Sequence, residues 1–311
     1  MNPSTQTLIA DITATLSSPE SLYGLLHEHR DGDPLPSQPA LSEFIELCRS
    51  VLFPGFYGQS NVNSNNLMYH TGVALERIHG LLTEQIQAGL CFASGWGQVE
   101  AYGETYASAQ DTRRHKAAQL ATEFISCLPQ LRQTLATDVE AAYLGDPAAE
   151  TYGEVISCYP IIRAITNYRV AHELLRLDVP LIPRIITEMA HSQTGIDIHP
   201  AATIGHHFTI DHGTGVVIGA TCIIGNNVKL YQGVTLGAKS FPVDEQGNPI
   251  KGIPRHPILE DNVIVYSNST ILGRITIGHD SVIGGNLWVT ENVPAGTRVL
   301  QQKPKSNPCN S

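Results

Sequence analysis

The sequence predicts an α+β protein, in which an N-terminal α-helical domain is followed by a left-handed parallel β-helix of hexapeptide repeats. Between residues 198 and 289, aliphatic residues recur every six positions, with two interruptions. Before residue 195, apolar residues instead follow the three-to-four spacing of amphipathic helices. A period of six fits neither a helix nor an ordinary strand, but it matches one short side of a triangular β-helical coil.

The helical domain, residues 1–195, contains a series of segments with one apolar face. We expect helices over 5–17, 41–53, 66–92, 112–143, 159–177 and 182–195. The most regular apolar stripe runs through 112–143, and Gly145-Asp146-Pro147 ends it. The open end of a β-helix exposes unpaired backbone, so we expect these helices to cap it.

The β-helical domain, residues 196–295, keeps one phase through thirteen aliphatic positions. These positions are Ile198, Ile204, Ile210, Ile218, Ile224, Leu230, Leu236, Leu259, Val265, Ile271, Ile277, Ile283 and Val289. The repeat slips by two residues at the sequence HGTG after Asp211. A second break, residues 238–254, reads as a loop excursion out of the coil, and residues 296–311 read as a C-terminal tail. Additional residues in a solenoid bulge outward, where sites are commonly built.

Composition and charge exclude several classes of partner. The 311 residues carry a net charge of −10, which argues against nucleic acid or an anionic membrane as the main partner. The six cysteines form no C-x-x-C motif and indicate free thiols in a reducing compartment. The start of the chain lacks the pattern of a signal peptide, and no apolar run approaches the ~20 residues of a membrane span. We therefore expect a cytoplasmic protein.

Polar, titratable residues gather where the repeat slips. Asp197, Asp211 and His212 are not needed to pack a coil. A histidine beside a carboxylate is a common general base, and we expect Asp197 to lie next to His212, which would deprotonate a hydroxyl that attacks a thioester. Arg255 and His256 stand where the long excursion returns. His256 is a second candidate for the base, and Arg255 is suited to hold a carboxylate.

A metal site is the rival interpretation of the same segment. His199, His206, His207 and His212 lie close together in the sequence, and hexapeptide β-helices are known to bind zinc through histidines at subunit contacts. We prefer the general base, because Asp197 explains His212 better than a metal does, and we predict no metal site.

Several motifs carry a family resemblance. They are DIHPAATIG (197–205), DHGTGVVIG (211–219), QGVTLG (232–237), RHP (255–257) and ILGRITIG (271–278), with Asp146-Pro147-Ala148 and NYRVAH (167–172) upstream. In these the chain closely resembles the serine O-acetyltransferases, hexapeptide-repeat enzymes of cysteine biosynthesis. The resemblance covers roughly residues 140–295. It implies transfer of an acetyl group from acetyl-CoA to L-serine, with no permanently bound cofactor.

The resemblance also implies roles for the acceptor-site residues. His212 would take the proton from the serine hydroxyl, with Asp197 as its partner. Asp146 and Asp211 would contact the serine amino group and Arg255 the carboxylate, while His256 would bind substrate near the acetyl group. Cysteine, an isostere of serine, would compete at this site as an inhibitor.

For the donor, the resemblance implies that acetyl-CoA lies in a groove between two prisms of a homotrimer. The matching positions are Gly237, Ala238, Ser267 and Gly285. Whether helical domains join two trimers is left open. The excursion before Arg255 and the segment VLQQKPK (299–305) depart from the family pattern at donor contacts. The chain ends in Cys309-Asn310-Ser311 rather than isoleucine, so we expect no tight complex with the partner sulfhydrylase.

Two other functions stay open at this stage. One is a hexapeptide acetyltransferase with another hydroxyl acceptor, such as homoserine, a sugar or an antibiotic. The other is a β-helical scaffold without activity, against which the presence of Asp197, His212 and Arg255 argues.

Overall fold

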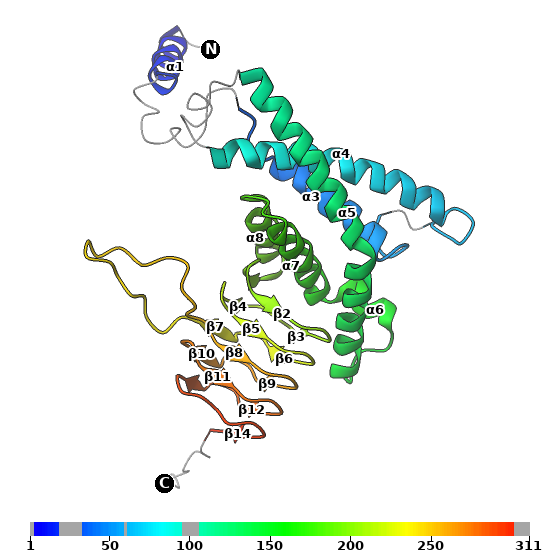
Figure 1. Cartoon of the computed structure of the whole chain (residues 1–311), viewed down its shortest axis with the longest axis vertical. Coiled ribbons are helices and arrows are strands. Elements are labelled where there is room, and N and C mark those ends of the chain that lie inside the picture. Colours follow the sequence, from blue (N-terminus) through cyan, green and yellow to red (C-terminus); the bar gives the residue numbers. More distant parts are fainter. Residues whose placement is uncertain (1–2, 19–32, 59–60, 95–105, 302–311) are drawn as a thin grey trace.

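The computed structural model describes residues 3–18, 33–58, 61–94 and 106–301, and it has two parts, helices first and strands after them (Figure 1). The helices are α1 (Pro3–Leu16), α3 (Gln38–Leu52), α4 (Leu67–Ser94), α5 (Tyr106–Gly145), α6 (Tyr152–Cys158), α7 (Pro160–Arg176) and α8 (Ile182–Thr194). Each segment in which we expected a helix is helical. None of the helices in these ranges has both the length and the apolarity needed to span a bilayer.

Local sequence explains where several helices begin and end. Ser37 caps α3 by accepting a hydrogen bond from the Ala40 N–H, and a proline stands in the first turn of that helix. Gly195 ends α8 in the left-handed conformation, with φ of 71°. The helix that we expected over 112–143 is longer at its start and runs through Pro129. Part of the small-residue stretch before it, residues 95–105, lies outside the described residues.

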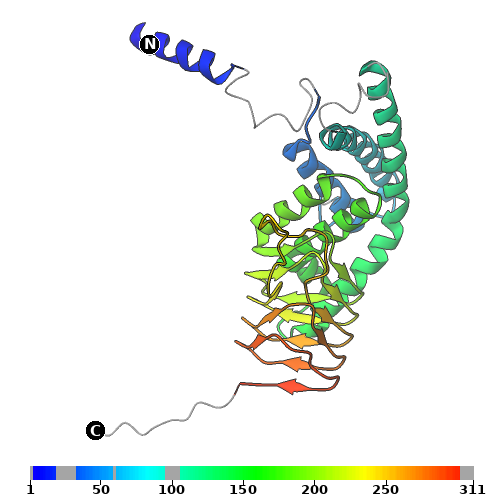
Figure 2. The same cartoon turned by 60° about the vertical axis from the view of Figure 1, so that its left-hand side comes forward.

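The strands form a parallel β-helix with three sheets, which confirms the fold class. The strands are β1 (Ile196–Ile198), β2 (Thr203–Ile204), β3 (Thr209–Asp211), β4 (Val216–Ile218), β5 (Ile223–Ile224), β6 (Lys229–Tyr231), β7 (Thr235–Gly237), β8 (Ile258–Leu259), β9 (Ile264–Val265), β10 (Thr270–Leu272), β11 (Thr276–Ile277), β12 (Val282–Ile283), β13 (Trp288–Val289) and β14 (Arg298–Val299). The sheets are β1-β4-β7-β10-β13, β2-β5-β8-β11 and β3-β6-β9-β12-β14. Figure 2 shows the turns stacked below the helices.

The six-residue period marks the interior of the solenoid. Twelve of the thirteen predicted positions are at most 7% exposed, and the thirteenth, Val289 in the last turn, is partly buried. Ile198 pairs with Ile218, which in turn pairs with Leu236, so the first turn is two residues longer than the second. Leu236 then pairs with Ile271 across the whole excursion. Both insertions therefore leave the stacking of the core residues intact.

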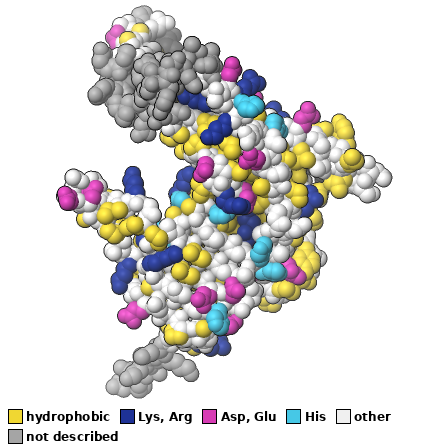
Figure 3. Space-filling view, viewed as in Figure 1, with side chains coloured by type: hydrophobic (Ala, Val, Ile, Leu, Met, Phe, Trp, Pro, Cys, Tyr) yellow, Lys and Arg dark blue, Asp and Glu magenta, His cyan; other side chains and the backbone are white. Residues whose placement is uncertain are grey.

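The excursion forms an arm between β7 and β8. Its two sides meet at a bridge between Val243 and Pro249, and Ile250 donates its N–H to the Pro242 carbonyl. The arm stands clear of the body, with acidic side chains at its tip (Figure 3). At the other end, β14 pairs with β12, so the solenoid continues beyond residue 295. Residues 309–311, on which our expectation about the sulfhydrylase depends, lie outside the described residues.

The motif NYRVAH (167–172) joins the helices to the first turn of the solenoid. It lies on α7, and Tyr168 donates its hydroxyl to the Ala202 carbonyl at 2.6 Å. Arg169 pairs with Asp138 of α5 at 2.6 Å and also donates to the Gly205 carbonyl. One continuous hydrophobic core runs from the helices into the solenoid. The helices therefore close its first turn, as the exposed backbone of an uncapped coil requires.

Candidate active site

The corner after β3 presents His212 to solvent. This residue has a left-handed backbone, with φ of 59°, and its side chain is 75% exposed. Gly213 follows with φ of 96°, and a Cβ there would lie 2.5 Å from Ile196 Cδ1, so the corner needs glycine. Asp211 Oδ1 lies 3.8 Å from His212 Nε2. The bulge predicted from the sequence thus holds an accessible imidazole beside a carboxylate.

Asp146 and Asp211 approach each other from the two parts of the molecule. Asp146 follows α5, while Asp211 ends β3, and both line one small pocket with Tyr159 and Lys229. The Tyr159 hydroxyl donates to Asp146 Oδ2 at 2.5 Å, and the Ala148 N–H donates to Oδ1 at 2.8 Å. These bonds, the Tyr159 bond first, lower the pKa of Asp146, and the same contact raises the pKa of Tyr159 to about 12. Asp146 is therefore held as an anion close to Asp211.

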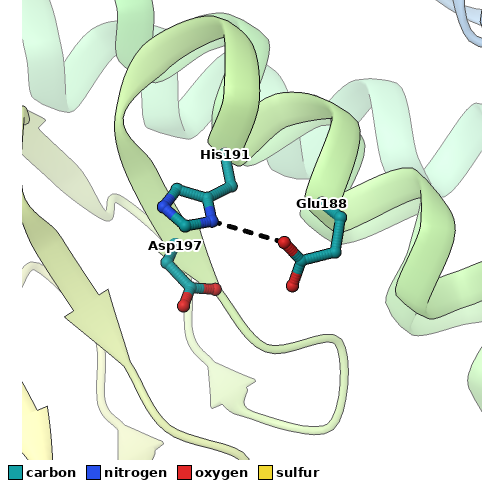
Figure 4. Close-up of side chains that lie close together, drawn as sticks. All are labelled: Glu188, His191 and Asp197. Atoms are coloured by element: carbon teal, nitrogen blue, oxygen red, sulfur yellow. Dashed lines mark hydrogen bonds and ion pairs between the residues drawn. The ribbon is translucent and has the colours of Figure 1, made fainter.

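Asp197 is turned toward helix α8 rather than toward His212. Its carboxylate lies with Glu188 and His191, and the ligand atoms of the three are within 4.8 Å of one another (Figure 4). His191 Nδ1 is 3.3 Å from Glu188 Oε2. In the described part of the chain, no hydrogen bond or ion pair joins Asp197 to His212. The register explains this, because β1 places Asp197 opposite Val217, which lies beyond the corner of His212.

The four histidines of the zinc interpretation lie at three different corners of the first turn. His199 follows β1, His206 and His207 follow β2, and His212 follows β3. His207 is committed to Glu140, at 3.1 Å, and its backbone N–H bonds to Thr137. Within one chain these side chains form no common ligand set among the described residues.

Arg255 and His256 lie at another corner, between the first and second sheets. His256 is 7% exposed, and its Nδ1 receives the Thr221 N–H at 3.1 Å. Burial, with Arg255 and Arg274 nearby, lowers the pKa of His256, so the ring is neutral near pH 7. The Arg255 Nε–H is buried and has no partner among the described residues. This orphan donor leaves Arg255 suited to an anionic group.

Gly219 leaves the space that the His256 ring occupies. A Cβ on Gly219 would lie 2.1 Å from His256 Cδ2. We expect Gly219→Ala to displace this ring, to reduce the free energy of unfolding by about 1–3 kcal/mol, and to impair activity. Urea unfolding and steady-state kinetics check both effects. The matched control is Gly80→Ala in α4, where a Cβ meets nothing within 4 Å. Equal behaviour of the two variants would contradict the role of Gly219.

His199 lies near the same corner, and its lowered pKa predicts how the stability of the protein depends on pH. Burial, then Arg184 and His256, lowers the pKa of His199 from the usual 6.5 of a histidine to about 4. Between these values the unfolded chain binds more protons than the folded one. The contribution of His199 to the free energy of unfolding is thus complete above pH 6.5 and is lost as the pH falls toward 4. We expect His199→Asn to flatten the pH dependence of the free energy of urea unfolding over this range, whereas an unchanged slope would refute the assignment.

The predicted donor positions fall on two edges of one sheet. Ser267 and Gly285 share the corner that leads into the first sheet, and a Cβ on Gly285 would lie 3.2 Å from the Ser267 carbonyl oxygen. Gly237 ends β7 at the opposite edge, and Ala238 begins the arm. The edge of Ser267 and Gly285 is also the edge of His212.

Three residues of the site were not predicted from the sequence. Tyr159 and Lys229 contact the predicted acidic residues, while Gly219 makes room for His256. Nothing in the spacing distinguished them, because a tyrosine before a helix and a lysine in a strand are ordinary surface residues. Gly219 follows the core position Ile218 within the regular repeat, so the pattern gave no reason to single it out.

Comparison with known proteins identifies relatives along most of the chain. No family model matched the sequence. A plasmid-encoded serine acetyltransferase of Synechococcus elongatus is 48% identical over 274 residues, which cover 88% of this chain and 84% of the relative. Among solved structures, serine acetyltransferase 1 of Entamoeba histolytica in complex with L-cysteine is similar with a TM-score of 0.69 and 31% identity, covering 95% of this chain and 99% of that one.

A third relative is soybean serine acetyltransferase complexed with serine. Its TM-score is 0.52 at 26% identity, and the match covers 86% of this chain and 98% of that one. The helical part and the solenoid are thus similar to those of solved serine acetyltransferases over nearly their full length. The chain belongs to the serine acetyltransferase family.

Proposed function

We propose that this chain transfers the acetyl group of acetyl-CoA to the hydroxyl of L-serine, with His212 as the general base. Family membership supports the reaction. We assign the base from one observation. The His212 imidazole is exposed at the bulged corner, beside Asp211 and close enough to Asp146 to interact with it electrostatically. No metal is required for this chemistry.

The proposed step is a direct transfer. Neutral His212 takes the proton from the serine hydroxyl while the oxygen attacks the carbonyl carbon of the thioester. The tetrahedral intermediate then collapses, the carbon–sulfur bond breaks, and the CoA thiolate leaves. The imidazolium returns the proton to the sulfur, so the products are O-acetylserine and CoA. Asp197 remains our proposed partner for the imidazolium, which requires its carboxylate to turn away from His191.

Recognition of serine is assigned to charges of both signs. Asp146 and Asp211 would hold the ammonium group, and Arg255, with His256 beside it, would hold the carboxylate. The Arg255 Nε–H supports this role, since it is buried and has no hydrogen-bond partner within the described ranges. Acetyl-CoA would lie along Ser267 and Gly285 on the edge of His212, with Gly237 and Ala238 contributing from the other edge.

The proposed site needs more than one copy of the chain. His212 and Asp211 stand at the corner after the third sheet, whereas Arg255 and His256 stand at the corner after the first. Two corners of one triangular prism face apart, but they meet when neighbouring prisms pack side by side. We therefore propose a homotrimer in which each site combines His212 of one copy with Arg255 of the next.

Two further properties belong to this proposal. A relative at 31% identity was solved with L-cysteine, and we propose that cysteine competes with serine here as an inhibitor. Free thiols at Cys48, Cys91, Cys127, Cys158 and Cys222 support a reducing, cytoplasmic location. A place in cysteine biosynthesis follows from the proposed reaction.

The test is release of free CoA thiol from acetyl-CoA by the purified protein. Parallel reactions contain L-serine, L-homoserine or no acceptor. We expect serine-dependent release that L-cysteine inhibits competitively against serine. Release of thiol only with homoserine would identify homoserine, rather than serine, as the acceptor. No release with any acceptor would leave a scaffold without activity as the remaining interpretation.

A further inference from the structure

Lys229 contacts one of the two carboxylates assigned to the serine ammonium group, and also the backbone carbonyl directly before the other. It lies on β6, one turn below β3, and the register pairs Thr209 with Lys229 and Asp211 with Tyr231. Its side chain is only 16% exposed, and its Nζ lies 3.3 Å from Asp211 Oδ2. The same Nζ donates to the Gly145 carbonyl at 2.5 Å. One ammonium group thus joins Asp211 of β3 to the end of α5, which lies 84 residues before the lysine in the sequence.

The Gly145 carbonyl is a specific anchor. Gly145 is the last residue of α5, where carbonyls lack helical partners and a cation is favoured. Asp146 is the next residue, so the lysine fixes the point from which Asp146 leaves the helix.

Tyr231 holds the lysine from the remaining side. The Lys229 Nζ lies 4.5 Å from the centre of the Tyr231 ring, which suits a cation–π contact. Tyr231 in turn stacks on Tyr266 of the next turn, with ring centres 4.9 Å apart. The ammonium group therefore has a carboxylate, a carbonyl and a ring face around it, and the stacked rings restrict its position.

We propose that Lys229 is a positioning residue for acceptor recognition, which sets the separation of Asp146 and Asp211 without contacting serine. Two carboxylates near one another repel, and the fixed positive charge of Lys229 offsets that repulsion. After the Tyr159 hydrogen bond, this charge also contributes to the lowered pKa of Asp146. This inference rests on the proposed function, because it gives the two carboxylates the ammonium of serine as ligand. It predicts an effect on serine alone, since the partners of this lysine in the described part of the chain are Asp211, Gly145 and Tyr231, none of which is a predicted donor position.

The test compares Lys229→Met with Lys229→Arg, using Lys116→Met as the matched control. Lys116 is an exposed lysine of α5, so the control removes the same charge far from the site. We expect Lys229→Met to raise the KM for serine about tenfold or more, because a charged hydrogen bond and an ion pair are lost. The KM for acetyl-CoA should stay within twofold of wild type, and Lys229→Arg should restore much of the serine KM.

The pH profile separates positioning from a general loss of structure. Without the cation, the pKa of Asp146 should rise, so the acid limb of kcat/KM for serine should move to higher pH in Lys229→Met. Thermal unfolding reports whether the variant is folded, and Lys229→Gln replaces it if it is not.

Two outcomes would overturn the inference. An unchanged KM for serine would show that Asp146 and Asp211 are placed without the lysine. A lower KM would show that Lys229 competes with the serine ammonium for Asp211 instead of positioning it. Absence of serine-dependent release by the wild-type protein would instead refute the proposed function, so the two failures are distinguishable.

Discussion

Replacing His212 by alanine is expected to lower kcat by about 10²- to 10⁴-fold, the contribution of a positioned general base. The side chain is 75% exposed and its imidazole makes no hydrogen bond in the described part of the chain. Its removal should therefore leave the fold intact while the serine hydroxyl loses its proton acceptor. The KM for acetyl-CoA should change little, because His212 is assigned to the acceptor.

The measurement is thiol release at saturating serine, accompanied by thermal unfolding of each variant. His206→Ala is the matched control, since His206 is an exposed histidine on the same turn at another corner. We expect the control to retain the activity of the wild type. An equal loss of activity in both variants would contradict the assignment of His212 as the general base. It would instead favour the hypothesis of a metal site formed by the histidines.

Asp138→Ala is expected to destabilise the protein by about 3–5 kcal/mol, the cost of leaving a buried charge without its partner. Asp138 is 1% exposed and receives two hydrogen bonds from Arg169, at 2.6 and 2.9 Å. Asp138 also accepts the Phe208 N–H at 3.0 Å. The variant would leave Arg169 buried between α5, α7 and the first turn of the solenoid.

Urea unfolding at pH 7 measures the effect, and two further variants test its cause. The double variant Asp138→Leu, Arg169→Met removes both charges and should recover part of the loss. Arg77→Met breaks the exposed pair with Glu43 and should have a much smaller effect, because solvent screens that pair. If Asp138→Ala unfolds like Arg77→Met, the junction between helices and solenoid does not depend on this ion pair.

The sequence predicted the architecture well because the architecture is repetitive. A residue such as Ile224 is one of a series, and each member constrains the phase of the others. The helices were found for a similar reason, since the face that packs against the core must be apolar along its length. The positions of His212 and Arg255 at broken repeats were likewise visible in the spacing.

The contacts between side chains were not predictable in the same way. The spacing of Asp197 and His212 suggested direct contact, but the carboxylate lies beside His191 and Glu188 of α8. Spacing along a coil fixes the height of a residue, whereas the direction of its side chain depends on the element packed outside the coil. The contact of Lys229 with the Gly145 carbonyl has no local signal, because it depends on how α5 meets the solenoid.

The unequal lengths of the solenoid turns have a consequence for variation of this protein. Ile218 pairs with Leu236 and Leu236 with Ile271, so the arm between them enters and leaves at one corner without shifting any residue below it. Length changes at corners are therefore decoupled from folding of the core. Whole segments can therefore be inserted or removed near the site without changing the stacking of the core. The arm is a suitable position for a deletion, a fluorescent label or a grafted binding peptide.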